Sequence, residues 1–326
     1  MAMKARTCAV DIGAMWVKAL ATVPGGTRQA TFPTRLAMGS RALLSREKAP
    51  QVVRFGDAHV RVGDRSSRSG FVEAELPKAL SDMHCTAVLI AAAFERLGIA
   101  GSAVLMVGSS TPINGNDAAY LRSSLSRCVL SNGSTVSVER VGTMGSVEAA
   151  FADFCLDKYA SVTLRAGREE RGRFAVVDFG SAAWRVALVT DGARREDIGF
   201  ATSEIATGME VERRACEIVE SRLNVVVSGV AEMFETGVYL AKRAKRDVNM
   251  HIAQARRETW ARFGPSLVDQ LKRHGASTIY AAGGNATLLR EASVSTKDID
   301  FQIAKHCETS IVQGLLKSAR RWGVQG

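Results

Sequence analysis

Two segments of the chain share one pattern: a strand that ends in Asp-x-Gly, a turn of small residues, and a returning apolar strand. The first runs from Cys8 to Lys18 and the second from Phe174 to Arg185. One such hairpin is common in proteins. Because the pattern occurs twice, and a Gly-Gly pair follows near the C-terminus, we expect a duplicated fold whose two turns serve one phosphate-bearing ligand.

The acidic residues of the two hairpins indicate metal-assisted chemistry. Asp11 and Asp178 end their strands, and two carboxylates beside a triphosphate can hold Mg²⁺ through its waters and orient an attacking water. We therefore predict that Asp11 and Asp178 are metal ligands and catalytic residues. Backbone amides of tight turns bind phosphate oxygens, and glycine lets a ligand approach the backbone closely. The predicted phosphate contacts are Gly13, Ala14, Gly180 and Ser181.

Three further features fit a nucleotide. Lys18 returns on the second strand of the first hairpin, where it can offset phosphate charge, and Gly208 opens a predicted helix whose N-terminus can face an anion. Gly283 and Gly284 follow a buried strand and leave bare backbone for an adenosine. Each feature has an ordinary alternative: a solvated lysine, a helix cap and a loop. Their order along the chain is more specific than any one of them.

Several other classes of site lack support in the sequence. It contains no Gly-x-x-x-x-Gly-Lys-Ser/Thr loop, no Gly-x-Gly-x-x-Gly after a strand and no Gly-x-Ser-x-Gly nucleophile turn. The six cysteines are scattered, which favours reduced thiols, and the five histidines lack metal-ligand spacing. No apolar run reaches the roughly 20 residues of a membrane helix. The N-terminus lacks the pattern of a signal peptide, so we expect a cytoplasmic protein.

The net charge of +10 raises the question of nucleic-acid binding. The basic residues form short runs interleaved with acids, and the aromatic residues, 6% of the chain, do not alternate with them. The sequence therefore offers no platform on which bases could stack. We expect the charge to lie on a solvated or self-associating surface, with direct DNA contact as the minor alternative.

The periodicity of apolar residues predicts an α/β chain with two similar halves, each a strand triplet followed by helices. The expected strands are 7–12, 16–23, 30–33, a hairpin over 52–63, 103–108, 134–141, 174–178, 185–190, 194–199 and 278–282, with a strand or loop at 294–301. The expected helices are 76–97, 117–129, 147–159, 208–223, 234–245, 248–274 and 305–321.

Taken together, these motifs resemble the actin, Hsp70 and sugar-kinase superfamily, and within it the bacterial plasmid-segregation actins of the ParM/StbA type. The likeness is carried by 11–18 and 178–181 as phosphate loops, 55–63 as a glycine-turned hairpin, 107–113 as a strand-ending Gly-x-Pro segment, 283–284 as the adenosine motif and 313–316 in the closing helix. It implies an actin-like fold with two duplicated α/β domains flanking a nucleotide cleft. Domain I would cover 1–158, completed by the C-terminal helix at about 305–326, and domain II 159–304.

The resemblance also implies an activity. Such proteins bind ATP, or GTP, with Mg²⁺ between two domains and polymerise into filaments, and hydrolysis then destabilises the filament. A DNA-bound adaptor of the ParR type couples the filament to the plasmid, so DNA contact is indirect and no membrane takes part. The chain is accordingly expected to be an actin-like ATPase that drives plasmid DNA segregation.

The chain departs from the family pattern at two places. In the second turn, Ala182, Ala183 and Arg185 occupy a stretch where the family has Thr and a final Asp, which removes hydroxyl groups and adds a cation. Met144 stands about where the family has a catalytic Glu, and Glu148 lies about 6 Å further along a helix. Glu148 is either a displaced catalytic substitute or a surface residue. These changes affect the expected rate of hydrolysis more than nucleotide binding.

Two other functions stay open. A non-polymerising ATP-binding scaffold of the same fold fits the altered second turn. A small-molecule kinase of the same superfamily would need a base near the acceptor hydroxyl, and the sequence shows no inserted substrate domain and no matching Asp. Nucleotide-dependent assembly separates the filament-forming ATPase from both.

Overall fold

The chain divides into two compact units, Met1–Val162 with Ile311–Gly326, and Thr163–Ser310. The chain passes from unit 1 to unit 2 after Val162 and returns to unit 1 after Ser310. These two boundaries were predicted after residues 158 and 304. A bridge between Leu156 and Val162 keeps the chain in unit 1 beyond residue 158. The computed structural model describes residues 6–38, 52–55, 58–62, 72–73, 83–109, 113–163, 174–189, 201–206, 209–227, 230–241, 244–291 and 299–324.

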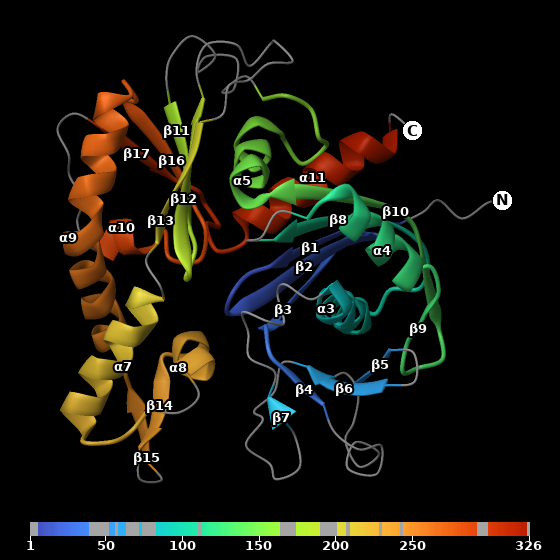
Figure 1. Cartoon of the computed structure of the whole chain (residues 1–326), viewed down its shortest axis with the longest axis horizontal. Helices are drawn as coiled ribbons and strands as arrows, with labels where there is room; N and C mark the ends of the chain where they lie inside the picture. Colours follow the sequence, from blue (N-terminus) through green and yellow to red (C-terminus); the bar gives the residue numbers. More distant parts are fainter. Residues whose placement is uncertain are drawn as a thin grey trace. The chain divides into compact units, whose positions relative to one another are not determined.

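Unit 1 is built on a six-stranded sheet with the order β3-β2-β1-β8-β10-β9 (Figure 1). The strands β1 to β3 form an antiparallel meander, and β8 and β10 run parallel to β1. The central strands β1 and β8 are mostly buried, which explains their continuous apolar sequences. The bounds are β1 Arg6–Ile12, β2 Trp16–Val23, β3 Gly26–Pro33, β8 Gly101–Ser109, β9 Cys128–Val129 and β10 Thr135–Gly145.

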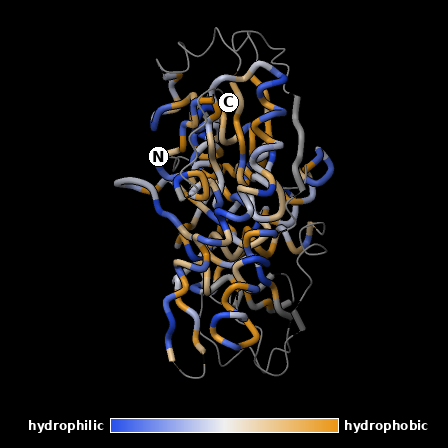
Figure 2. Tube along the Cα trace, turned by 90° about the vertical axis from the view of Figure 1, so that its left-hand side faces the viewer, coloured by the Kyte–Doolittle hydropathy of each residue, from blue (hydrophilic) through white to orange (hydrophobic). Residues whose placement is uncertain are grey.

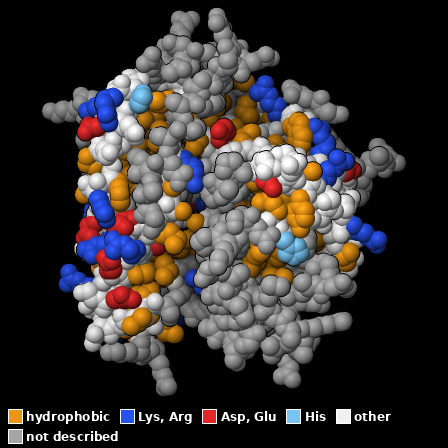
Figure 3. Space-filling model, in the orientation of Figure 1, with side chains coloured by type: hydrophobic (Ala, Val, Ile, Leu, Met, Phe, Trp, Pro, Cys, Tyr) orange, Lys and Arg blue, Asp and Glu red, His pale blue; other side chains and the backbone are white. Residues whose placement is uncertain are grey.

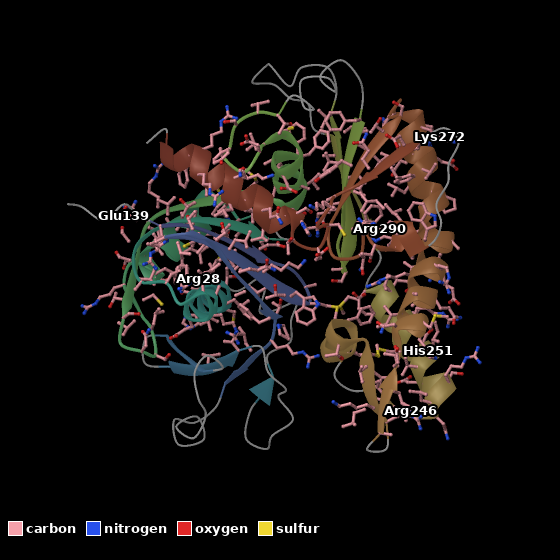
Figure 4. The ribbon with its side chains drawn as sticks, turned by 180° about the vertical axis from the view of Figure 1, so that it is seen from behind. Arg28, Glu139, Arg246, His251, Lys272 and Arg290 are labelled. Atoms are coloured by element: carbon pink, nitrogen blue, oxygen red, sulfur yellow. The ribbon has the colours of Figure 1, made fainter. Side chains whose placement is uncertain are left out.

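Helix α3 (Met83–Leu97) packs against β1, β2 and β3 and supplies much of the core of unit 1. It ends where Gly98 takes a φ of +57°, in the left-handed region that glycine tolerates. The Nη1 atom of Arg28 on β3 donates hydrogen bonds to the carbonyls of Leu97 and Gly98, each 3.0 Å long (Figure 4). The predicted helix began at residue 76, and its part up to residue 82 lies outside the described residues.

Two predicted helices of unit 1 are wrong at their C-terminal ends. Helix α4 (Gly115–Ser124) begins with a capping box between Asn114 and Asp117, but it stops before residue 129 because β9 pairs with β10. Helix α5 (Ser146–Cys155) stops before residue 159 because the Asp157 side chain accepts hydrogen bonds from the amides of Tyr159 and Ser161 and forms a turn. Local polar contacts of this kind compete with helix formation.

The C-terminal helix α11 (Ser310–Val324) belongs to unit 1 and packs on it through glycines. A Cβ atom at Gly314 would overlap the Ala149 carbonyl of α5 and lie 3.0 Å from the Asp153 nitrogen. A Cβ atom at Gly108 of β8 would lie 2.7 Å from Leu315. The Lys317 ammonium is 2.7 Å from the Asp153 carboxylate, which fixes the helix further.

A smaller four-stranded sheet of unit 1 has the order β5-β6-β4-β7. The predicted hairpin over 52–63 is confirmed by the antiparallel pairing of β5 and β6, although its turn residues Gly56 and Asp57 lie outside the described residues. The bounds are β4 Leu36–Met38, β5 Val52–Phe55, β6 Ala58–Val62 and β7 Val72–Glu73.

Unit 2 repeats the strand connections of unit 1. Its sheet has the order β13-β12-β11-β16-β17, in which β11 pairs antiparallel with β12 and parallel with β16, as β1 does with β2 and β8. The third strand was predicted at 194–199, which lies outside the described residues, and the structure describes it at 201–206. The bounds are β11 Phe174–Phe179, β12 Ala183–Val189, β13 Ala201–Ala206, β16 Thr278–Ala282 and β17 Asp300–Ile303.

The long helix α9 of unit 2 runs along one side of this sheet, and α7 and α8 lie beside a small hairpin (Figure 1). The helix predicted over 234–245 is wrong: α8 ends at Thr236, and Gly237, with a φ of +64°, starts the hairpin β14–β15. In β14 the residues Tyr239 and Ala241 are buried and Leu240 is exposed, the alternation of a strand with one covered face. The bounds are α7 Glu210–Leu223, α8 Val230–Thr236, β14 Val238–Ala241, β15 Ala244–Asp247, α9 Asn249–Arg273 and α10 Leu288–Glu291.

Helix α9 is continuous through Pro265, as predicted, and packs against α7. Its inner face meets an aromatic cluster in which rings lie 5.0 to 6.4 Å apart, Phe179, Trp184, Trp260, Phe263 and Phe301. Along the helical coils of Figure 2, hydrophobic and hydrophilic colours alternate, as expected for helices with one buried face. The outer faces of α7 and α9 carry a network of ion pairs, which Figure 3 shows as clustered blue and red side chains.

All six cysteines lie in described segments, and none forms a disulfide. Among the described residues, no helix combines the length and the apolar character that crossing a membrane requires.

The close packing of α11 on α5 predicts a cost for Gly314→Ala. The added Cβ has no room beside the Ala149 carbonyl, so we expect the free energy of unfolding to fall by about 1–3 kcal/mol in urea titrations. Gly115→Ala is the matched control, because nothing lies within 4 Å of a Cβ atom there. Equal stability of the Gly314→Ala variant and the unmodified chain would contradict this packing.

Candidate functional site

The first predicted loop is a tight turn in unit 1. The closing pair of its hairpin is Ile12 with Val17. The Gly13 amide donates to the Trp16 carbonyl at 3.0 Å, and a Cβ atom at Gly13 would lie 3.1 Å from that oxygen. Glycine is thus the residue that permits this approach.

Thr34, which sequence reasoning missed, fastens this first turn. Its side chain is 2% exposed, its hydroxyl donates to the Gly13 carbonyl at 2.9 Å, and its amide donates to the Met15 carbonyl at 2.8 Å. Thr34 follows β3 and lies about 20 residues from the turn in the chain, so no local pattern marks it. Ala14 lies between these anchored residues, in the middle of the turn.

The second predicted loop, in unit 2, has the same local geometry. Phe179 pairs with Trp184 to close the hairpin. A Cβ atom at Gly180 would lie 2.9 Å from the Ala183 carbonyl, which is the counterpart of the contact at Gly13. This turn is fastened differently, because the Met209 amide donates to the Ser181 carbonyl at 3.1 Å. The predicted contact Gly208, next to Met209, lies outside the described residues.

Each hairpin places a cation directly across from its strand-end aspartate. Asp11 pairs with Lys18 between β1 and β2, and Asp178 pairs with Arg185 between β11 and β12. Both aspartates are buried, and residues opposite each other in a sheet present their side chains on the same face. Arg185, which the sequence marked only as a departure from the family pattern, is therefore the unit 2 counterpart of Lys18.

The predicted adenosine motif packs directly on the second hairpin. Gly283 has a φ of +93°, and a Cβ atom there would overlap the Asp178 carboxylate and lie 2.8 Å from the Phe179 nitrogen. The Asn285 amide donates to the Phe179 carbonyl at 2.9 Å, so the turn Gly283–Asn285 is tied to the end of β11. Gly284, between them, is exposed. The structure thus brings Asp178, Gly180 and Gly283 together.

Next to the turn Gly283–Asn285 lies a carboxyl group that sequence reasoning also missed. Glu212, in the first turn of α7, is buried, and burial raises its pKa to about 7. Hydrogen bonds from its own backbone amide and from the Asn285 side chain, and the charge of Arg256, oppose this rise. No pattern in the sequence marks Glu212, because an acidic residue in a first helical turn is ordinarily a solvated one.

Glu148 lies apart from the two hairpins in sequence, in the first turn of α5. Its carboxylate folds back beside Gly145, the residue that precedes the helix. A carboxylate at this position suits the free amides and the positive end of the helix dipole. Met144 lies in β10, opposite Gly108 of β8, and its sulfur accepts from the Ser318 hydroxyl of α11 at 3.8 Å.

Each hairpin, taken by itself, has a carboxylate of the kind that Mg²⁺ binds. Within the described segments, no group of three or more His, Cys, Asp and Glu residues lies close enough to hold a metal ion. Mg²⁺ does not need such a cage, because it commonly keeps several waters and binds through one or two carboxylates together with substrate phosphates. Asp11 of unit 1 and Asp178 of unit 2 each lie near a strand end beside a tight turn, and each side chain is a carboxylate of this kind.

Comparison with known proteins identifies the fold. No family model and no curated protein sequence matches the chain. Solved structures do match it over nearly its whole length. The archaeal actin homologue Ta0583 in complex with ADP has a TM-score of 0.68 and 16% identity, and the match covers 97% of this chain and 99% of that one.

Two ParM structures match similarly. ParM of Bacillus thuringiensis with ATP has a TM-score of 0.66 and 13% identity, with 99% of this chain and 100% of that one covered. A 15-stranded ParM filament from Clostridium botulinum has a TM-score of 0.63 and 12% identity, with 99% and 100% covered. The chain therefore has the actin-like fold, which confirms the predicted fold class.

The buried Glu212 predicts a pH-dependent stability. Because its pKa is raised from 4.5 to about 7, the folded chain keeps a proton that the unfolded chain loses in this window. The stabilisation is full below pH 4.5 and is lost as the pH rises to 7, by about 3 kcal/mol. Urea titrations should show that Glu212→Gln flattens this slope. Glu217→Gln, at a side chain 39% exposed, should leave it unchanged, and an unaltered slope in Glu212→Gln would contradict the assignment.

Proposed function

We propose that the chain is an actin-like ATPase that binds ATP with Mg²⁺, polymerises into filaments and drives plasmid DNA segregation. The observation that carries the proposal is the duplicated hairpin, with the same closing length, the same glycine contact and the same aspartate–cation register in both units. Structures of the same fold have been solved with ADP, with ATP and as a filament, which supports the nucleotide and the assembly. GTP is the alternative nucleotide.

In this proposal the two turns hold the phosphates. The amides of Gly13, Ala14, Gly180 and Ser181 donate to phosphate oxygens, and the Lys18 ammonium offsets their charge. Arg185 adds a second cation, which the register opposite Asp178 supports. Bound Mg²⁺ would neutralise charge on the phosphates, and Asp11 and Asp178 hold its waters.

The adenosine rests on the turn at Gly283 and Gly284. The support is the tight packing of Gly283 on Asp178, which places bare backbone beside the second phosphate loop, and the exposure of Gly284. Gly208, two residues before α7 in the sequence, is proposed to let the N-terminus of that helix face the nucleotide. A side chain at Gly284 would occupy the space that a base needs.

Hydrolysis requires a group that orients the attacking water, and we assign this role to Asp178 and Asp11, with Glu148 as a third candidate. The Glu148 carboxylate lies beside Gly145 at the start of its own helix, and the alanines at positions 182 and 183 offer no hydroxyl group in the second turn. Both observations support slow turnover rather than loss of nucleotide binding.

The proposed partners follow from the assembly. A second copy of the chain is the first partner, and a DNA-bound adaptor of the ParR type is the second, so contact with DNA is indirect and takes place in the cytoplasm. The ion pairs among α7 and α9, such as Arg213 with Glu210 and Arg214 with Glu258, leave much of the basic charge of that face balanced. This balance supports a protein contact over a nucleic-acid contact there.

A second candidate is a non-polymerising ATP-binding scaffold. The alanines of the second turn favour it, because positions 182 and 183 then offer no side-chain hydroxyl to a phosphate. Such a chain would bind ATP and stay monomeric.

Assembly is the direct test of the leading proposal. Light scattering and sedimentation of micromolar protein should rise on addition of ATP with Mg²⁺ and stay flat with buffer alone. If ADP and ATP bind but neither changes the sedimentation, the scaffold is the correct assignment.

Asp178→Ala tests the role of the second hairpin. We expect phosphate release to fall by at least about tenfold, since a metal- and water-orienting carboxylate is lost, while nucleotide binding persists in part. Asp269→Ala, at an exposed position on α9, is the control and should release phosphate at the normal rate. Unchanged release by the Asp178→Ala variant would refute this role.

A further inference from the structure

The first turn of α7 holds a carboxyl group that the proposed chemistry does not use. Glu212 is 6% exposed, and among the described residues its Oε2 atom has no hydrogen-bond partner. The carboxyl group accepts from the Asn285 side chain and from its own backbone amide. A buried oxygen without a partner is uncommon, because it has given up its hydrogen bonds to water without replacing them.

The charges around Glu212 only partly compensate for its burial. The Arg256 guanidinium of α9 is the cation that lowers the pKa of Glu212. The Cys216 thiol lies one turn further along α7, and its pKa is raised chiefly by burial and also by the charges of nearby glutamates, Glu212 among them. The neighbouring charged groups of α7 and α9 are engaged with one another: Glu210 with Arg213 and Arg262, and Glu258 with Arg214. Burial therefore outweighs the attraction of Arg256.

Asn285 connects Glu212 to the candidate site. Its side chain donates to the Glu212 carboxyl group, and its backbone amide donates to the Phe179 carbonyl at 2.9 Å. Phe179 follows Asp178, against which Gly283 packs, and the Gly283 amide donates to the Cys307 carbonyl at 2.9 Å. The turn Gly283–Asn285 thus lies between Glu212 on one side and the end of β11 on the other.

We propose that Glu212 is a positioning residue for the turn Gly283–Asn285, which packs over its carboxyl group when that group is neutral and loosens when it is ionised. The inference rests on the proposed function, because this turn is the proposed adenosine contact. It extends that function, because the packing of the proposed adenosine contact would then depend on pH.

The direction follows from linkage. Burial is the largest influence on Glu212 and raises its pKa from 4.5 to about 7. Loosening the turn returns water to the carboxyl group and lowers its pKa toward the ordinary value, so the packed turn holds the proton more tightly than the loosened one. Rising pH therefore shifts the turn toward the loosened form, mainly between pH 4.5 and 7 and to a smaller extent just above 7.

Amide hydrogen exchange of the nucleotide-free chain tests this directly. The probes are the amides of Gly283 and Asn285, at pH 6 and pH 8, after correction for the intrinsic exchange rates. If loosening restores the ordinary pKa of Glu212, the population of the loosened turn should rise by about tenfold between these pH values. In Glu212→Gln, whose side chain cannot ionise, the population should be the same at both.

Glu217→Gln is the matched control, because it removes a carboxylate from the same helix at a side chain that is 39% exposed. It should keep the tenfold change. A flat profile in the unmodified chain overturns the inference, and so does an unchanged tenfold rise in Glu212→Gln. The profile of the unmodified chain is decisive by itself if the Glu212→Gln variant does not fold.

Repeating the exchange with ADP separates this inference from the proposed function. Protection of Gly283 and Asn285 by ADP supports both. If ADP leaves these amides unprotected while the pH profile and its loss in Glu212→Gln persist, the adenosine assignment is wrong and the role of Glu212 stands.

Discussion

The close approach of a carbonyl oxygen to a glycine α-carbon is the constraint on which both candidate loops depend. The carbonyl three residues further on lies 3.1 Å from the Cβ position of Gly13 and 2.9 Å from that of Gly180. A larger residue would press on this carbonyl oxygen and strain the turn. The turn sets the register of the returning strand, and with it the position of the cation opposite each aspartate. Gly283 adds a third contact of this kind, against Asp178 itself.

The two units repeat this arrangement but hold it in place differently. In unit 1, Thr34 fixes the first turn through its hydroxyl and its amide. In unit 2, the turn is fixed by the amides of Met209, which precedes α7, and of Asn285, in the turn that follows β16. The second loop is therefore connected to α7, and through Asn285 to the buried Glu212, in a way that the first is not. The two copies of the hairpin are thus held by contacts from different parts of the fold.

Many of the strands and helices could be predicted because they depend on sequence patterns of neighbouring residues. Apolar runs that end in Asp-x-Gly predicted the paired strands of both hairpins, and α9 was predicted through Pro265. The failures share a cause. The segment at 238–247 has an apolar content that suits either a helix or a strand, and the left-handed Gly237 together with strand pairing decided for the hairpin. At residue 128, the pairing of β9 with β10 overrode a helical pattern in the same way.

The sequence by itself determined the two hairpins with an aspartate near the end of the first strand, their glycine turns and the actin-like fold class, because turn chemistry and strand alternation act between residues close in the chain. Only the tertiary structure decided that Arg185 is the counterpart of Lys18, that Gly283 rests on Asp178, and that Glu212 is buried behind Asn285. Each of these depends on strand register or on contacts between distant segments. The identity of a glutamate in the sequence does not show whether its carboxyl group is solvated or buried. Only the fold decides this, and with it the pKa of the group.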